Sequence, residues 1–228
     1  MRIAVLTGAG ISAESGVPTF RGSSGLWRTF KPEELATPQA FEKDPKLVWE
    51  WYDWRRSIIR KAKPNKGHIL IAHLEQLFED FLLITQNVDG LHRKAGSKKV
   101  IELHGNIWRV LCTVCGKRYY NYQVPLEEIP PRCKYCKGLL RPDVVWFGES
   151  LPKEEWETAL EFVSSCSMLL VVGTSGVVYP VAWLPFLAKQ KGAKVVEINP
   201  EDTPISQIAH IRIKKKASEG MEEFFKML

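Results

Sequence analysis

The sequence has no long hydrophobic run. No apolar stretch reaches the roughly 18 residues that a membrane-spanning helix needs, and Arg2 is followed at once by a strand-like run instead of a secretory signal. Repeats, low-complexity tracts and domain-separating linkers are also missing. We therefore expect a cytoplasmic protein with no membrane partner. Its 228 residues, 45% of them hydrophobic, are enough for one core with a small satellite.

Cysteine is scarce. Five cysteines are too few for a disulfide-built secreted domain of this length, and four of them form two C-x-x-C pairs separated by 17 residues. This spacing is typical of a zinc ribbon, whose closed tetrahedron of thiolates leaves the metal no open position for catalysis. One structural zinc ion is therefore predicted on Cys112, Cys115, Cys133 and Cys136. Cys166, in an apolar stretch, is predicted to be a small buried residue.

The charge is only moderately one-sided. A net charge of +6 suits an anionic ligand or a basic surface for nucleic acid, but the basic residues are too dispersed to distinguish the two. The densest basic run, residues 214–216, follows a strand-like segment and is interpreted as a solvated edge.

Short apolar runs of strand length alternate with helical patterns. The expected strands are Arg2–Thr7, Phe81–Thr85, Val100–Leu103, Met168–Gly173 and Lys194–Asn199. Helical periodicity covers Ile69–Glu79, Glu154–Ser164 and Ala182–Lys191. This alternation predicts an α/β fold with a doubly wound, Rossmann-like parallel sheet. Two segments, residues 22–66 and 108–141, interrupt the alternation and are expected to lie outside the sheet as helices and as a zinc-ribbon module.

A glycine-rich segment directly follows the first expected strand. Residues 8–13 have the G-x-G-x-x-A form of a dinucleotide-binding fingerprint. Gly8 would allow the turn, Gly10 the close approach of a pyrophosphate, and Ala13 close helix packing. The alternative is a tight strand-to-helix turn with no ligand.

Two features depart from the usual dinucleotide site. Gly16 and Pro18 cut short the helix that should follow, and no carboxylate ends a second strand to bind the ribose hydroxyls. Asn199, at the end of an expected strand, offers a neutral amide for that role. We therefore expect a dinucleotide bound in a nonstandard way, with residues 18–21 as a loop over it.

Polar residues follow two other expected strands. Asn87 and Asp89 carry groups that recognise a carboxamide such as nicotinamide, although an Asx-type turn is the simpler interpretation. His104 ends the next strand and is the best placed of five histidines. A neutral imidazole there would serve as a general base near neutral pH, the alternative being a structural hydrogen bond.

Seven separated motifs together closely resemble the sirtuin family, in the family's order and across nearly the whole chain. They are Gly8-Ala9-Gly10-Ile11-Ser12, Pro18-Thr19-Phe20-Arg21, Gln86-Asn87-Val88-Asp89, Leu103-His104-Gly105, the two cysteine pairs, Phe147-Gly148-Glu149 and Gly173-Thr174-Ser175. The resemblance implies an NAD-dependent protein lysine deacylase. The acyl-lysine oxygen would displace nicotinamide, and His104 would then act as general base through the ribose hydroxyls. The products would be nicotinamide, O-acyl-ADP-ribose and free lysine.

The resemblance also implies a division of the chain into parts. Residues 1–228 would form one sirtuin-type catalytic domain with a Rossmann-like part at 1–30, 67–107 and 142–228, a helical and cofactor-loop insertion at 31–66, and a zinc-binding module at 108–141. NAD would be bound by Gly8, Ala9, Gly10, Ile11, Ala13, Thr19, Phe20, Arg21, Trp27, Gln86, Asn87, Asp89, Gly173, Thr174, Ser175, Asn199, Glu201 and Ala217.

The expected substrates are acylated lysine side chains of proteins, with chromatin or other nucleic-acid-associated proteins as candidates. The peptide would pair as a strand between Phe147-Gly148-Glu149 and Gly176-Val177-Val178, through backbone hydrogen bonds that are largely indifferent to its sequence.

One helical pattern concerns the acyl group itself. Tyr52 and Arg55 form the Y-x-x-R pattern that resembles the sirtuin subgroup able to remove succinyl and malonyl groups. Three-residue spacing puts both side chains on one helix face, where they could bind an acyl carboxylate. Ala36 matches the small residue that makes room for a longer acyl chain in that subgroup. The alternative is a surface helix with solvated arginines.

The residues leave other functions open. A dinucleotide-dependent oxidoreductase is the nearest enzyme, although the interrupted helix and the missing ribose carboxylate argue against it. A nonenzymatic zinc-ribbon protein that binds nucleic acid is favoured by the charge, but it leaves the polar strand ends without a purpose. ADP-ribosyl transfer to protein is a third alternative, because it starts from the same cleavage of NAD.

Overall fold

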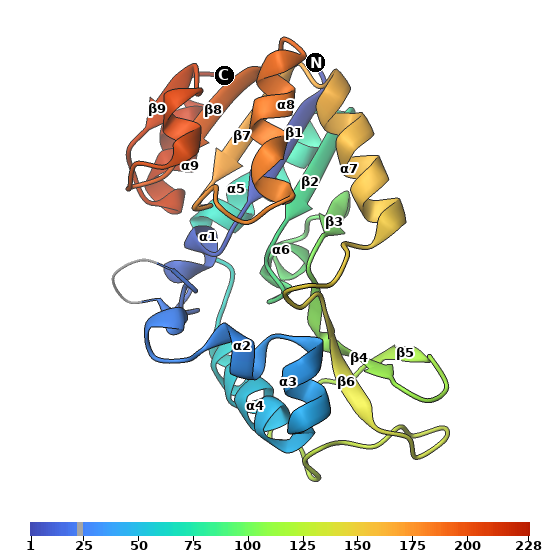
Figure 1. Ribbon diagram of the computed structural model, residues 1–228. Helices are drawn as coiled ribbons and strands as arrows, with labels where there is room; N and C mark the ends of the chain where they lie inside the picture. The colour runs from blue at the N-terminus through green and yellow to red at the C-terminus, as the bar shows by residue number, and fades with distance from the viewer. Residues whose placement is uncertain (22–24) are drawn as a thin grey trace.

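A computed structural model describes residues 1–21 and 25–228 (Figure 1). Six strands form a parallel sheet in the order β3 (Val100–Glu102), β2 (Phe81–Thr85), β1 (Ile3–Thr7), β7 (Met168–Val172), β8 (Lys194–Ile198) and β9 (Ile211–Ile213). The chain builds outward from β1 to one side and then continues on the other side from β7. This is the order of a Rossmann sheet, so the predicted doubly wound fold is confirmed.

Helices cover both faces of this sheet because its strands are apolar on both sides. Alternate residues of β1 point to opposite faces: Ala4 and Leu6 join one hydrophobic cluster, whereas Ile3 and Val5 join the other. The first cluster is completed by α7 (Lys153–Ser165) and α8 (Leu184–Gln190), and the second by α5 (Lys66–Leu77) and α9 (Ala217–Phe225). Burial on both faces explains the continuous apolar runs in the sequence.

A smaller domain lies beside the carboxyl ends of β1 and β2 (Figure 1). It contains α2 (Pro32–Leu35), α3 (Pro38–Lys43) and α4 (Pro45–Lys61), together with an antiparallel sheet in the order β5 (Arg118–Tyr120), β4 (Gly105–Cys112) and β6 (Leu140–Val144). These strands extend a few residues beyond the predicted 108–141 module. Helices and sheet share one hydrophobic cluster, to which Trp49 and Val110 belong, and the Trp49 indole N–H donates to the Leu140 carbonyl at 2.7 Å. The helical insertion and the zinc module are therefore packed as one body.

Helix α4 has clear sequence signals at its start. The Asp44 side chain accepts a hydrogen bond from the Leu47 amide at 2.9 Å, and Pro45 occupies the first turn, where a missing N–H costs nothing. The helix continues for 17 residues and buries Tyr52, Arg55 and Arg56. The Arg56 Nε donates to the Ile107 carbonyl at 2.9 Å, which ties α4 to β4.

The remaining elements are short connections. They are α1 (Gly10–Ala13), α6 (Leu91–Lys94), and the 3₁₀ turns η1 (Leu26–Arg28), η2 (Val181–Trp183) and η3 (Pro204–Gln207). Within the described ranges, no helix is both long and apolar enough to cross a bilayer. Cys166 is buried, as predicted, and burial raises the pKa of its thiol to about 11.

Candidate active site

A cavity of about 580 Å³ lies where the strands of the parallel sheet end. Its walls come from the loops after β1, β2, β3, β7 and β8 and, opposite them, from the smaller domain. Ligands of open parallel sheets bind outside these strand ends, and the volume is typical of a small-molecule or cofactor site. Of the predicted residues, the cavity is lined by Gly8, Ala9, Gly10, Ala13, Thr19, Phe20, Arg21, Ala36, Tyr52, Arg55, Gln86, Asn87, His104, Phe147, Gly148, Glu149, Gly173, Thr174, Ser175, Asn199, Glu201 and Ala217.

Three predicted site residues do not line the cavity. Ile11 and Asp89 are buried behind its wall, and Val177 is 47% exposed beside it, whereas its neighbour Val178 forms part of the lining. The side chain of Trp27 lies outside the part of the chain that the structure describes. The roles assigned to these four residues remain predictions, as do the roles of the residues that line the cavity.

The turn after β1 depends on two glycines. A Cβ atom on Gly8 would lie 2.8 Å from Thr174 Cα, and one on Gly10 would lie 2.7 Å from the Gly173 carbonyl oxygen. The Gly10 amide instead donates to that oxygen at 2.8 Å. The glycines therefore let the first loop pack directly on the loop after β7, in addition to any approach to a pyrophosphate. As predicted, the following helix α1 is short and ends at Ala13.

Two amide side chains connect the cavity loops by hydrogen bonds. Gln86 Nε2 donates to Thr174 Oγ1 at 2.9 Å, and Asn199 Nδ2 donates to the Thr174 carbonyl at 2.9 Å. Three loops that follow different strands are thus held together at Thr174. The Asn199 side chain remains at the cavity wall, where a neutral amide was predicted to contact a ribose.

Asn87 and Asp89 form one buried network with Ser12. Asn87 Nδ2 donates to the Gly8 carbonyl at 3.0 Å and to Ser12 Oγ at 3.3 Å, and Ser12 Oγ donates to Asp89 Oδ2 at 2.7 Å. The Leu91 amide donates to the other carboxylate oxygen at 2.8 Å. Since both Asn87 donors are used inside the protein, its carbonyl oxygen is the group left for the cavity. Burial raises the pKa of Asp89, although its hydrogen bonds oppose this effect.

His104 has a defined tautomer. Its Nδ1 lies 3.1 Å from the Gln86 carbonyl oxygen, which can only accept, so Nδ1 carries the proton. The unprotonated Nε2 is therefore the basic atom of the ring, which lines the cavity. Burial lowers the pKa of His104 to about 4, with a smaller opposing effect from the hydrogen bond to Gln86. The ring is neutral near pH 7 and can accept a proton.

Acid is expected to destabilise the fold. Burial lowers the pKa of His68 and His104 to about 4, against about 6.5 for an exposed histidine, and it also lowers the pKa of His92 well below its usual value. Between these pH values the unfolded chain binds protons that the folded chain does not. The free energy of unfolding therefore decreases as the pH is lowered from about 6.5 to about 4, by roughly 3 kcal/mol for each histidine whose pKa is lowered to this extent.

The measurement is urea unfolding between pH 7 and pH 4. Asp89 and Glu102 act in the opposite sense, because burial raises their pKa values and favours the protonated fold at low pH. Comparison with His104→Asn isolates one histidine, and the variant should lose less stability over this range than the wild type. Parallel curves for the two proteins would contradict the assignment.

The wall opposite the sheet contains Tyr52, Arg55 and Ala36. Arg55 is only 6% exposed, and its guanidinium lies 4.7 Å from the ring centre of Phe20 and 4.9 Å from that of Trp51. Within residues 1–21 and 25–228 it forms no salt bridge. Desolvation lowers the pKa of Arg55, but an arginine keeps its charge. The smaller domain thus presents a buried cation to the cavity.

The predicted peptide-binding segment is joined to the wall that contains Ala36. The Phe147 amide donates to the Ala36 carbonyl at 3.0 Å. Arg141 holds Glu149 by two hydrogen bonds of 2.6 and 2.9 Å, which fixes the end of the segment. Residues far apart in sequence are therefore adjacent at one end of the cavity.

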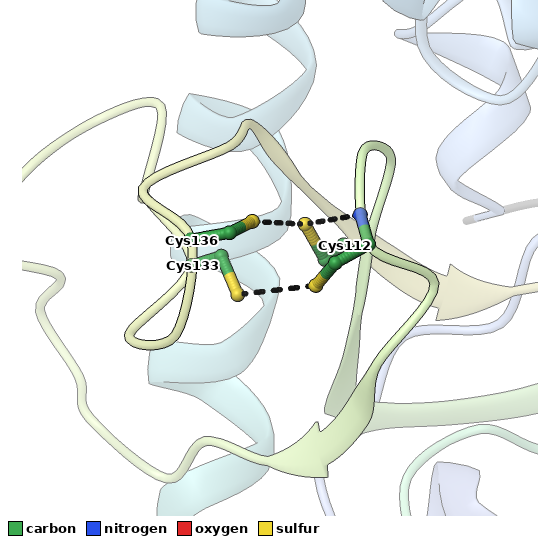
Figure 2. Close-up of side chains that lie close together, drawn as sticks. Cys112, Cys133 and Cys136 are labelled. Carbon is green, nitrogen blue, oxygen red and sulfur yellow. Dashed lines mark hydrogen bonds between the residues drawn. The ribbon is translucent and has the colours of Figure 1, made fainter.

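The four cysteines of the pairs approach one another from two loops of the smaller domain. Figure 2 shows Cys112 opposite Cys133 and Cys136, and all four sulfur atoms lie within 4.8 Å of one another. The Cys112–Cys136 and Cys115–Cys133 Sγ–Sγ distances of 3.4 and 3.9 Å are close to the roughly 3.8 Å edge of a tetrahedron built with zinc–sulfur bonds of about 2.3 Å. The donor set fits one structural zinc ion, as predicted. None of the four cysteines lines the cavity.

Removal of zinc is expected to lower activity through loss of structure. Cys112 and Cys133 are buried in the cluster that also contains Trp49 and Tyr52, so the metal supports the cavity wall that carries Tyr52. Chelation should therefore reduce turnover together with the near-ultraviolet circular dichroism of the aromatic cluster. A zinc-free protein that kept its fold and full turnover would contradict this role.

Some cavity residues were missed from the sequence. Trp51, Trp146, Tyr179 and Lys216 line it without having been assigned a role. Trp146 directly precedes the motif at 147–149, so its position was the one available signal. Tyr179 and Lys216 belong to no motif, and only the packing of their loops brings them to the cavity.

The fold and the site define a dinucleotide-binding α/β protein with a structural zinc module. The profile of the Sir2 family matches residues 8–180. An "NAD-dependent protein deacylase" of Aquifex aeolicus is 61% identical over 228 residues, which are all of this chain and 95% of the relative. The chain belongs to the Sir2 family, the sirtuins that the motifs resembled.

Solved structures agree over the whole chain. A Sir2 homologue in complex with NAD superimposes with a TM-score of 0.92 at 48% identity, covering 99% of this chain and 88% of the other. A structure described as Sir2 with a p53 peptide and NAD⁺ gives a TM-score of 0.87 at 36% identity, covering 99% and 92%. The Rossmann sheet, the smaller domain and their relative placement are thus those of solved family members.

Proposed function

We propose that this protein is an NAD-dependent protein lysine deacylase whose acyl pocket accepts succinyl and malonyl groups as well as acetyl. Family membership and the deacylase relatives support the deacylase activity. The single observation that carries the assignment to this chain is the cavity that joins His104 to the glycine loops of the dinucleotide fingerprint.

Different residues of the chain would bind NAD and the acylated peptide. The loops at residues 8–10 and 173–175 would hold NAD, which supplies the ribose carbon that takes the acyl oxygen of the substrate as nicotinamide leaves. His104 Nε2 accepts the proton released when a ribose hydroxyl attacks the acyl carbon, while the Gln86 carbonyl keeps the ring in place. The backbone of residues 147–149 would pair with the substrate peptide.

The preference for an acidic acyl group rests on Arg55. A buried guanidinium that forms no salt bridge within the described residues is costly, and a carboxylate from the substrate would compensate it. Arg55 and Tyr52 line the same wall as Ala36, whose single methyl side chain leaves room for a longer acyl group. A terminal acyl carboxylate, as in succinyl-lysine or malonyl-lysine, supplies the missing partner.

The direct test uses the protein with NAD and a panel of acetyl-, malonyl- and succinyl-lysine peptides of one sequence. Mass spectrometry should find nicotinamide, the O-acyl-ADP-ribose that matches each peptide, and free lysine. Formation of NADH would favour the oxidoreductase, and mass added to a protein would favour ADP-ribosyl transfer. If only the acetyl peptide were turned over, the deacylase activity would be supported and the assignment of an acidic acyl pocket would be contradicted.

We further propose that the natural substrates include nucleic-acid-associated proteins and that the enzyme works in the cytoplasm. The net charge of +6 supports the first, because a positive net charge favours association with nucleic acid and its complexes. The metal-ligand arrangement of four cysteines supports the second, because it requires reduced thiols. Salt-sensitive copurification with nucleic acid and cell fractionation test these two proposals.

A further inference from the structure

The Tyr52 hydroxyl receives a hydrogen bond from inside the protein. The indole nitrogen of Trp146 donates to Tyr52 Oη at 2.9 Å, and the two side chains are only 3% and 2% exposed. An indole N–H can only donate, so Tyr52 Oη is the acceptor in this bond. The proton of the tyrosine hydroxyl must therefore point away from Trp146 and remains available for another acceptor.

Two neighbouring side chains hold the Trp146 ring. The Arg141 guanidinium lies 3.7 Å from the ring centre, and Phe41 packs against the indole with ring centres 5.3 Å apart. The backbone amide of Trp146 donates to Glu149 Oε2 at 2.8 Å, and Arg141 holds the same carboxylate by two hydrogen bonds. Since ring and backbone are both held, the indole N–H keeps its direction towards Tyr52.

Tyr52 remains a hydrogen-bond donor at working pH. Burial raises the pKa of its phenol, and the neighbouring Arg55 lowers it to a smaller extent. Both Tyr52 and Trp146 line the cavity, as does Arg55. The Tyr52 hydroxyl, as a hydrogen-bond donor, and the Arg55 guanidinium thus lie in the same wall of the cavity. Together they can bind the two oxygens of one carboxylate.

We propose that Trp146 is a specificity-determining positioning residue: by occupying the acceptor side of the Tyr52 hydroxyl, it commits the tyrosine proton to the carboxylate of an acidic acyl group. This inference rests on the proposed desuccinylase function. An acetyl group has no carboxylate to receive the proton, so the arrangement favours acidic acyl-lysine without a comparable gain for acetyl-lysine. Trp146 acts through Tyr52 and touches neither reacting atom.

The test is Trp146→Phe, which removes the N–H and keeps an aromatic ring beneath Arg141. The ratio of kcat/KM for succinyl-lysine to that for acetyl-lysine peptide should fall about tenfold, the effect of misdirecting one hydrogen bond to a charged group. Tyr52→Phe should lower the same ratio, and the double variant should be no worse than Tyr52→Phe alone. Trp156→Phe on α7, away from the cavity, is the matched control.

The outcomes separate the two proposals. An unchanged ratio in Trp146→Phe, or additive losses in the double variant, would overturn the role of Trp146 while Arg55→Met still reports on the acidic pocket. A wild-type enzyme that does not turn over the succinyl peptide would overturn both. A fall in the ratio that disappears in the Tyr52→Phe background supports the inference, because a general loss of structure would reduce turnover of both peptides equally.

Discussion

His104→Ala is expected to abolish NAD-dependent deacylation of every acyl peptide. The variant removes the only imidazole at the wall of the cavity within the described residues, and a positioned general base contributes about 10²- to 10⁴-fold to a rate. Because the neutral Nε2 acts after NAD and peptide are bound, kcat should fall while the affinity for NAD changes little. Steady-state kinetics and calorimetric titration with NAD measure the two quantities.

Two comparisons make this result specific. His73→Ala changes an exposed histidine on α5 and serves as the control for the loss of an imidazole. Circular dichroism must show that His104→Ala keeps the fold. The Val145 amide donates to the backbone carbonyl of His104 at 2.9 Å, a bond that does not involve the imidazole. Substantial turnover by a folded, NAD-binding variant would remove His104 from the mechanism.

Arg55→Met is expected to lower the kcat/KM ratio of succinyl-lysine to acetyl-lysine peptide by about 10²-fold, since losing one partner of a buried charge pair costs roughly 2 to 5 kcal/mol. Methionine is unbranched and keeps most of the aliphatic stem of Arg55, but it removes the guanidinium that lies against the rings of Phe20 and Trp51. The loss should therefore reflect the missing charge. Parallel kinetics on the two peptides give the ratio directly.

Arg60→Met on the same helix is the matched control. Arg60 is exposed and donates to the Tyr122 carbonyl, outside the cavity. If Arg55→Met reduced turnover of both peptides equally, the guanidinium would be a packing element of α4 and the assignment of an acidic pocket would fail. If Arg60→Met reproduced the selective loss, a general effect of surface charge would explain it.

The zinc site and the first loop were predictable because their signals are local. Each C-x-x-C pair places two thiolates on one turn, so spacing alone predicts the ligands. Gly8 and Gly10 follow a buried strand directly, and a loop in that position of a parallel sheet faces the ligand crevice. The alternation of strands and helices predicted the sheet for the same reason, since it reflects burial on both faces.

The direction of the Asp89 side chain could not be predicted from the sequence. Its place after β2 suggested a side chain in the cavity, but the carboxylate turns inward to Ser12 and to the Leu91 amide. The choice between these directions depends on the Ser12 hydroxyl, 77 positions earlier in the chain. No local pattern contains that information.

The sequence by itself determined the metal ligands, the parallel sheet, the glycine loop and the family, because each of these depends on residues close together in the chain or on motifs in a fixed order. Only the tertiary structure decided how the helices at residues 32–61 pack with the zinc module in one core, and how Trp146 meets Tyr52 across 94 positions. Those contacts arise when separate apolar faces are buried together, and burial then orients the polar groups carried with them. The direction of the Tyr52 proton is therefore a property of the folded chain.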